Sequence, residues 1–182
     1  MKFLKYITVI CAVVFSTSLT AQGEKVKDLM KDAQTAKQML LERNEGLQDY
    51  FDNSAGYVIF PNVGKGGIII GGSSGNGILY EEGQALGLAH LRKASVGIKA
   101  GGQALVEVLF FENETELSNF KDGEYELSAS ASAVIVESGA SINNIFEKGV
   151  AVFAMPKAGL MADLSIGGQK FSYENFDYQD SK

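Results

Sequence analysis

Few side chains in this sequence have the types and spacing that catalysis needs. His90 is the only histidine and Cys11 the only cysteine. A histidine metal site, or a proton relay between histidines, needs a second residue of this kind. His90 stands in an alternating run typical of a strand, which favours a structural role. The acids at Glu81-Glu82 and at 177–180 have the pattern of solvated charge rather than of paired catalysts. We therefore expect no enzyme activity, no metal ligand set and no cofactor.

Two glycine-rich stretches look at first like phosphate-binding loops. In Gly64-Lys65-Gly66 the lysine is followed by glycine. The Walker pattern needs serine or threonine there to hold magnesium, and then a helix. The stretch from Gly72 to Gly77 opens no predicted helix either, so it does not fit a dinucleotide-binding turn. We expect no nucleotide cofactor.

Residues 1–21 have the layout of a secretory signal. Lys2 and Lys5 precede an uncharged apolar stretch, and small or polar residues lead to a cleavage junction at Ala21-Gln22. The apolar stretch is too short for a membrane anchor, which needs about 20 apolar residues. We expect export to the periplasm or cell envelope, or beyond the cell, with the signal and its cysteine removed.

The charge of the mature chain excludes one large class of partner. Removing residues 1–21 takes the basic residues from 16 to 14 against 22 acidic ones, which leaves a net charge of −8. A chain this acidic does not wrap nucleic acid, because that affinity comes mostly from neutralised phosphates. The remaining length, about 160 residues, is typical of one domain. We divide it into a helical segment at 22–54, a β-rich part at 55–176 and an acidic tail at 177–182.

Residues 24 to about 53 carry apolar side chains at three- and four-residue steps, with charged side chains between them. This period predicts an amphipathic helix, with Gly46 as a candidate break. Such helices usually cover a core. The alternative is a helix that lies on a membrane surface, which the lysines from Lys25 to Lys37 favour.

After Ala55 the pattern becomes that of β-strands, with frequent glycine and short apolar runs between turn residues. We predict a polar loop at 73–76, a tight turn at Gly83-Gln84 and one short internal helix capped by Asn113. The predicted fold is α+β: the N-terminal amphipathic helix packs on a curved antiparallel β-sheet, or partly closed barrel, of about nine short strands. The runs that predict strands are 57–61, 67–71, 77–82, 85–93, 95–100, 104–112, 125–135, 150–155, 160–166 and 170–173.

Three glycine-rich segments resemble, in order, the signature segments of the SYLF family. The first reads GYVIFPNVGKGG at 56–67 and continues to Gly77. The second reads SVGIKAGGQ at 95–103, and the third reads KAGLMADLSIG at 157–167. Lys99, in the second segment, stands where the family pattern has glutamine. Three segments in the right order are more specific than any single glycine string.

The resemblance implies lipid binding. Eukaryotic members of the family bind phosphoinositides at membranes, and some bind actin filaments, through basic residues and an amphipathic N-terminal helix. An exported chain would meet neither of these ligands, so we do not expect actin as a partner. The resemblance then implies a non-enzymatic domain of the cell envelope that recognises an anionic phospholipid, or a similar amphiphile, at a membrane surface.

Such a role would need cations to meet head groups and apolar surface to meet chains. The candidates are Lys65, at the lysine position of the family signature, the adjacent pair Arg92 and Lys93, and Lys27 and Lys31 on the predicted helix. Each cation near an anionic surface contributes about 1 kcal/mol, so three or four together would matter. For each lysine alone, plain surface charge is the alternative. A second class of function is an envelope structural or protein-interaction module, which would bind a partner through an edge strand or the helix without lipid.

Overall fold

The structure of the chain is a computed structural model that describes residues 2–66, 70–96, 103–123, 125–128, 132–140, 142, 145–157 and 168–176. For 2–22, 65–66, 70–71, 94–96 and 103 it describes the backbone alone. In chain order the elements are α1 Lys2–Arg43, α2 Leu47–Asn53, β1 Gly56–Gly66, β2 Ile70–Glu81, β3 Gln84–Val96, β4 Gln103–Phe111, α3 Glu114–Lys121, β5 Tyr125–Glu126, β6 Val134–Ile135, β7 Val150–Pro156 and β8 Lys170–Asn175.

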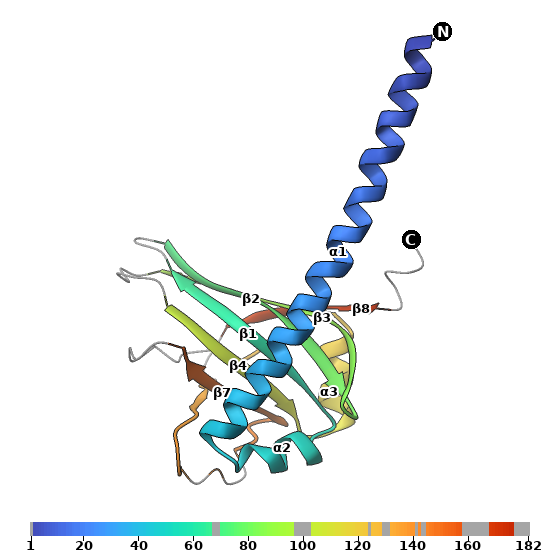
Figure 1. The fold of residues 1–182 in the computed structure, drawn as a ribbon. Helices are drawn as coiled ribbons and strands as arrows, with labels where there is room; N and C mark the ends of the chain where they lie inside the picture. The colour runs from blue at the N-terminus through green and yellow to red at the C-terminus, as the bar shows by residue number, and fades with distance from the viewer. Residues whose placement is uncertain are drawn as a thin grey trace.

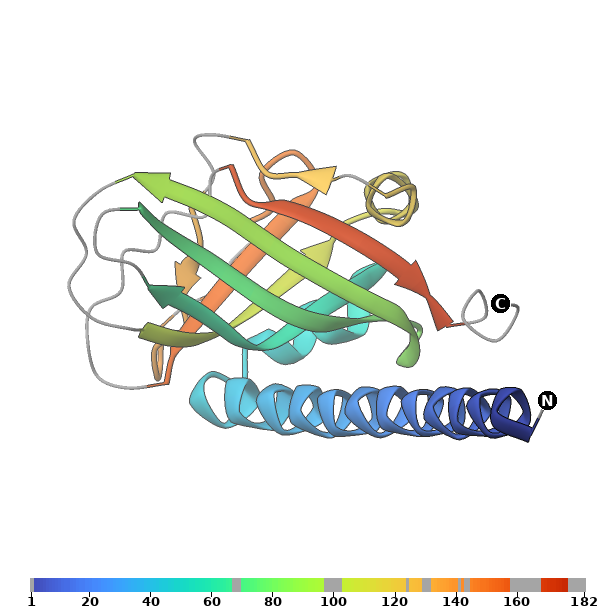
Figure 2. The same cartoon turned by 90° about the horizontal axis from the view of Figure 1, so that it is seen from above.

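The strands form one 8-stranded sheet in the order β5-β8-β3-β2-β1-β4-β7-β6. α1 crosses one face of this sheet, and its N-terminal part projects beyond it (Figure 1). Seen from above, the sheet curls away from α1 into a half-barrel (Figure 2). The predicted α+β fold, with the N-terminal helix packed on a curved sheet, is confirmed. Two details differ from the prediction: the described residues form eight strands, near the predicted nine, and the sheet is mixed rather than antiparallel, because β6 pairs parallel with β7.

Long strands run through two of the predicted breaks. The predicted polar loop at 73–76 lies inside β2 and pairs residue by residue with 90–93 of β3. β3 likewise continues through Ala94 to Val96. Gly77 of β2 does not form a turn. It allows the neighbouring strands to approach closely, since a Cβ at this position would lie 2.6 Å from the Ile59 carbonyl oxygen.

The β2–β3 hairpin turn lies one residue earlier than predicted. Its central residues are Glu82 and Gly83, with φ of 49° and 78°. Two positive φ values are typical of the type I′ turn, whose twist matches that of the flanking strands. The predicted strand at 160–166 and the acidic tail at 177–182 lie outside the described residues.

A single segment supplies both edges of the sheet. The predicted strand at 125–135 is present as two short strands, β5 beside β8 and β6 beside β7. Between them Leu127 and Ala133 are buried in the concave side of the sheet. The described residues at both ends of this segment therefore contribute to the concave side of the sheet.

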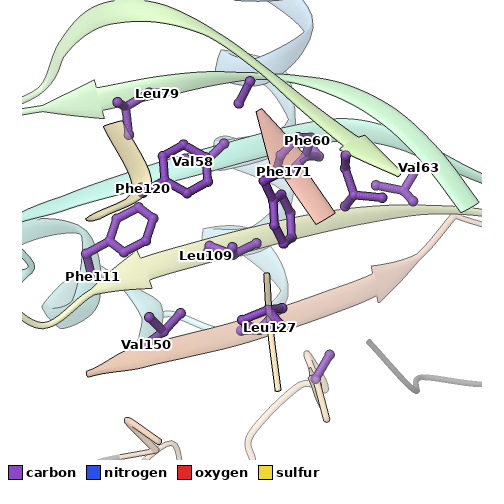
Figure 3. Close-up of a cluster of buried hydrophobic side chains, with 14 of the residues drawn as sticks. Val58, Phe60, Val63, Leu79, Leu109, Phe111, Phe120, Leu127, Val150 and Phe171 are labelled. Atoms are coloured by element: carbon purple, nitrogen blue, oxygen red, sulfur yellow. The ribbon is translucent and has the colours of Figure 1, made fainter. Parts of the chain in front are cut away.

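Two apolar clusters lie on opposite faces of the sheet. The inner core fills the concave face and includes Phe60, Phe120 of α3 and Phe171 of β8 (Figure 3). The outer core lies under α1 and α2, where Ala33 and Leu40 meet the sheet. Each fully buried large apolar side chain stabilises the fold by about 1.5–3 kcal/mol, so both clusters contribute substantially. The core-covering role expected for the N-terminal helix agrees with this packing.

The predicted break near Gly46 is present, and Asn44 explains it. The Asn44 side-chain amide donates to the Glu137 and Ala140 carbonyls, each at 2.9 Å. Its carbonyl oxygen accepts from the Gly46 N–H at 3.0 Å. These bonds end α1 at Arg43 and let α2 begin at Leu47.

No helix within the described part of the chain combines the length and the apolar character needed to cross a bilayer.

Candidate functional site

A cleft of about 530 Å³ lies where β3, β8 and β5 meet. We call it the basic cleft. Three of its side chains carry positive charge and one, Glu126, carries negative charge. It is lined by His90, Arg92, Lys93, Tyr125, Glu126, Gly168, Lys170, Phe171 and Ser172.

The register of β3 and β8 brings the cations together. Arg92 pairs with Lys170, and His90 pairs with Ser172. Directly opposed like charges are destabilising in a sheet. Glu126 of β5 relieves part of this repulsion, because its carboxylate lies 3.5 Å from the Lys170 ammonium. The Lys170 side chain is still 73% exposed. The cleft thus keeps an excess of positive charge open to an anion.

Two aromatic residues, Tyr125 and Phe171, line the cleft where it borders the inner core. Phe171 is only 2% exposed and belongs to the inner core. The Tyr125 ring lies 6.3 Å from the Phe171 ring and 5.7 Å from the Phe120 ring, measured between centroids. The Tyr125 hydroxyl donates to Glu116 at 3.3 Å. Burial, and then the Glu116 carboxylate, raise the pKa of Tyr125 to about 12. The raised pKa keeps the Tyr125 phenol protonated to a more alkaline pH than an exposed tyrosine.

His90 lies at the rim of the basic cleft. Its Nδ1 is 2.9 Å from the Asn76 side-chain oxygen on the neighbouring strand β2. Its Nε2 is 3.9 Å from a Glu174 carboxylate oxygen. These contacts tie three strands together, in keeping with the structural role predicted for this histidine. Within the described residues, no group of three histidine, cysteine or acidic side chains is arranged to hold a metal ion.

The structure brings part of the predicted cation site together. Arg92 and Lys93 both line the basic cleft. Lys65 of β1 pairs with Ser73, and Ser73 pairs with Lys93 on its other side. The backbones of Lys65 and Lys93 are thus two strands apart in one row, about 10 Å. For Lys65 only the backbone is described.

The helix lysines are not part of this cleft. Lys27 and Lys31 are exposed on α1, which packs against β1 and β2, and neither lines the basic cleft. Lys37 is held in the outer core instead. Its ammonium donates to the Tyr57 hydroxyl at 3.2 Å, at the start of β1. Lys65 lies eight residues further along that strand, about 26 Å away. The predicted site therefore divides into two surfaces.

Sequence reasoning missed Lys170, Tyr125 and the buried residues Glu107 and Gln169. Lys170 stands at the start of a predicted strand, but only the register shows that it faces Arg92. Glu107 had a readable signal, because it is a lone charge inside the apolar run from Leu105 to Phe111. A charge in a strand that is buried on both faces usually has a specific partner.

The described residues of the second and third SYLF-like segments lie at one end of the sheet, where the Lys157 N–H donates to the Ala104 carbonyl at 3.0 Å and where β1 of the first segment also ends. β1 and β3 end there and β2 and β4 begin there, as the pairs Gly66 with Gly72 and Ile70 with Val96 show. Comparison with protein-family models gives no match to this chain, and comparison with curated proteins also gives none. The SYLF resemblance therefore rests on the three segments and stays a prediction.

Proposed function

We propose that this protein is a non-enzymatic binder of anionic amphiphiles, with phospholipid head groups as the expected ligands and the basic cleft as the site. One observation carries the proposal: Arg92 and Lys170 are paired across β3 and β8, and they line one cleft together with Lys93, Tyr125 and Phe171. Cations and apolar surface are the two elements that an anionic amphiphile requires. Lys65, whose backbone lies in the same row as that of Lys93, stays a predicted lipid contact.

The strength of such binding follows from the number of cations. Each one near an anionic surface is worth about 1 kcal/mol, or about fivefold in affinity. The mature chain expected after removal of residues 1–21 carries a net charge of −8, from 14 basic and 22 acidic residues. The remainder of the protein is therefore repelled by an anionic membrane, which would orient the molecule with the basic cleft towards it. We expect weak binding that depends on salt, because charges on a surface are screened beyond a Debye length of about 8 Å at physiological ionic strength.

Vesicle co-sedimentation tests the proposal. The mature chain should bind phosphatidylcholine vesicles that contain phosphatidylglycerol more strongly than pure phosphatidylcholine vesicles, and high salt should weaken the binding. The variant with Arg92, Lys93 and Lys170 all replaced by alanine should lose most of the binding to anionic vesicles. Circular dichroism would establish that this variant is folded.

A matched control has the same change of net charge at another surface. The variant with Lys25, Lys27 and Lys31 replaced by alanine removes three exposed lysines from α1. It should bind nearly as well as the wild type if the basic cleft is the site. A larger loss of vesicle binding in this α1 variant than in the cleft variant would indicate that the binding site lies on the helix. Absence of binding to anionic vesicles at low salt would overturn lipid recognition.

The second candidate is an envelope interaction module. β6 is the last strand of the described sheet on its side, and Ile135 on this strand is 36% exposed. An outer strand edge can accept a strand of a partner protein. This function would be favoured if vesicle binding is absent and a defined envelope protein co-purifies with the wild type but not with an Ile135→Pro variant.

A further inference from the structure

Two polar side chains meet inside the half-barrel, far from solvent. Glu107 of β4 lies between Phe60 of β1 and Ala154 of β7, both members of the inner core. Gln169 directly precedes β8. The Gln169 side-chain amide donates to a Glu107 carboxylate oxygen at 3.3 Å. Both residues are 0% exposed. This hydrogen bond joins β4 to the start of β8 across the interior of the half-barrel.

The backbone of Gln169 is tied to β5 at the same point. Its carbonyl accepts from the Leu127 N–H at 3.1 Å, and the Leu127 carbonyl accepts from the Gly168 N–H at 3.1 Å. On the next row, Lys170 pairs with Glu126. One residue thus fixes β8 to β4 through its side chain and β8 to β5 through its backbone.

Stability alone does not explain a buried amide and carboxylate at this position. Polar groups taken out of water need partners to offset their desolvation, and apolar side chains of similar volume often stabilise a core as well or better. A directed hydrogen bond, in contrast, fixes the relative position of two strands. That property matters here, because β5 is only two residues long and has few ladder bonds of its own.

We infer that Glu107 and Gln169 are positioning residues for the basic cleft. This inference rests on the proposed function. Gly168, Lys170 and Phe171 line the cleft from the β8 side, and Tyr125 and Glu126 line it from β5. All of them lie within a few residues of the Gln169 contacts. The buried hydrogen bond therefore sets where the Lys170 ammonium stands relative to Arg92, and so how well two cations can meet one anionic head group.

The test variant replaces both partners by apolar side chains, E107L/Q169L. This change removes both partners of the hydrogen bond together, so the protein should keep its circular dichroism spectrum. Hydrogen exchange should become faster at the amides of Leu127 and Gly168. Binding to phosphatidylglycerol-containing vesicles should fall about fivefold, the worth of one cation at an anionic surface.

Two further variants keep the inference testable. E107Q/Q169E exchanges the two side chains and can restore the amide-to-carboxylate hydrogen bond, so it should recover both the slow exchange and the binding. If E107L/Q169L does not fold, Gln169→Met removes the donor while keeping an unbranched side chain of similar length. It should show the same local increase in exchange.

Unchanged exchange at Leu127 and Gly168 in a folded E107L/Q169L or Gln169→Met variant would overturn the inference. Vesicle binding equal to that of the wild type would overturn it as well. Failure of the proposed function is a separate result: the wild type would then not bind anionic vesicles, while the exchange measurement would still show whether the buried pair holds β5 and β8.

Discussion

The ammonium group of Lys37 lies 4.3 Å from the centre of the Phe51 ring. It also lies 5.0 Å from the centre of the Tyr57 ring and donates to the Tyr57 hydroxyl at 3.2 Å. Lys37 belongs to α1, Phe51 to α2 and Tyr57 to β1. One charged side chain therefore connects both N-terminal helices with the sheet, above the aromatic part of the outer core.

Replacing this lysine should cost stability. Lys37→Ala removes a cation–π contact, a hydrogen bond and the packing of an aliphatic stem, and we expect the free energy of unfolding to fall by about 1–2 kcal/mol. Lys31→Ala is the matched control, since Lys31 is exposed on the same helix. It should change the free energy by no more than about 0.5 kcal/mol. Urea unfolding followed by circular dichroism gives both values, and equal effects of the two variants would contradict the role of Lys37.

Local signals in the sequence predicted local structure well. The Asn113 cap is present, with its side-chain oxygen accepting from the Glu116 N–H at 3.1 Å, and α3 runs over Glu114–Lys121. The break near Gly46 is also present. These features depend on a few neighbouring residues, so the pattern that encodes them can be read from a short window of sequence.

Features that depend on register could not be predicted. The pairing of Arg92 with Lys170 joins residues far apart in the chain, and nothing in their immediate neighbours encodes it. The predicted break at Ser73–Asn76 was wrong for a related reason. Small polar residues are typical of loops, but they also suit strands whose neighbours approach closely. Whether such residues form a loop or part of a strand is decided by the packing of the adjacent strands. Lys37 is one of the lysines that favour the membrane-surface alternative for the predicted helix. Its aromatic partners could not be predicted, since Phe51 comes from α2 and Tyr57 from β1.

Alkaline pH should destabilise the protein, and Tyr80 is one reason. Burial, and then the neighbouring Tyr57, raise the pKa of Tyr80 from 10.0 to about 12. A raised pKa in the folded state means that folding favours the protonated phenol. Its contribution to stability is therefore complete below pH 10 and is lost as the pH rises from 10 to about 12. The raised pKa of Tyr125 acts in the same direction.

Replacing each tyrosine by phenylalanine separates the contributions of Tyr80 and Tyr125 to stability. The Tyr80 hydroxyl is buried and makes no hydrogen bond within the described residues, so Tyr80→Phe should be neutral or stabilising at pH 7. Tyr125→Phe loses the bond to Glu116 and should cost about 1 kcal/mol. Each variant should reduce the loss of stability between pH 10 and about 12. Urea unfolding across this range measures the effect. A marked destabilisation by Tyr80→Phe at pH 7 would contradict our account of its hydroxyl.

The mature chain should begin near Gln22. α1 continues without a break from Lys2 to Arg43. Among its described side chains, those buried against the sheet are Ala33, Ala36 and Leu40, which lie beyond the predicted junction. A chain that starts at Gln22 should therefore keep the whole outer core. Mass spectrometry of protein purified from its native host would identify the first residue. An intact Met1 in a cytoplasmic fraction would rule out export by a cleaved signal.

The last prediction concerns the one carboxylate that lines the basic cleft. Glu126 lies 3.5 Å from the Lys170 ammonium and competes with any anionic ligand for that group. Glu126→Gln keeps the shape of the side chain and removes its charge. It should therefore strengthen binding to phosphatidylglycerol-containing vesicles, by up to about fivefold.

Glu45→Gln is the control for this change. Glu45 is exposed between α1 and α2, so its replacement alters the net charge equally without touching the basic cleft. Co-sedimentation at low salt compares the two variants with the wild type, and high salt should remove the difference between them, because charges are then screened within about 3 Å at 1 M ionic strength. An equal gain in both variants would mean that net charge alone governs binding. A loss of binding in Glu126→Gln would mean that the ion pair orders Lys170 for the ligand instead of competing with it.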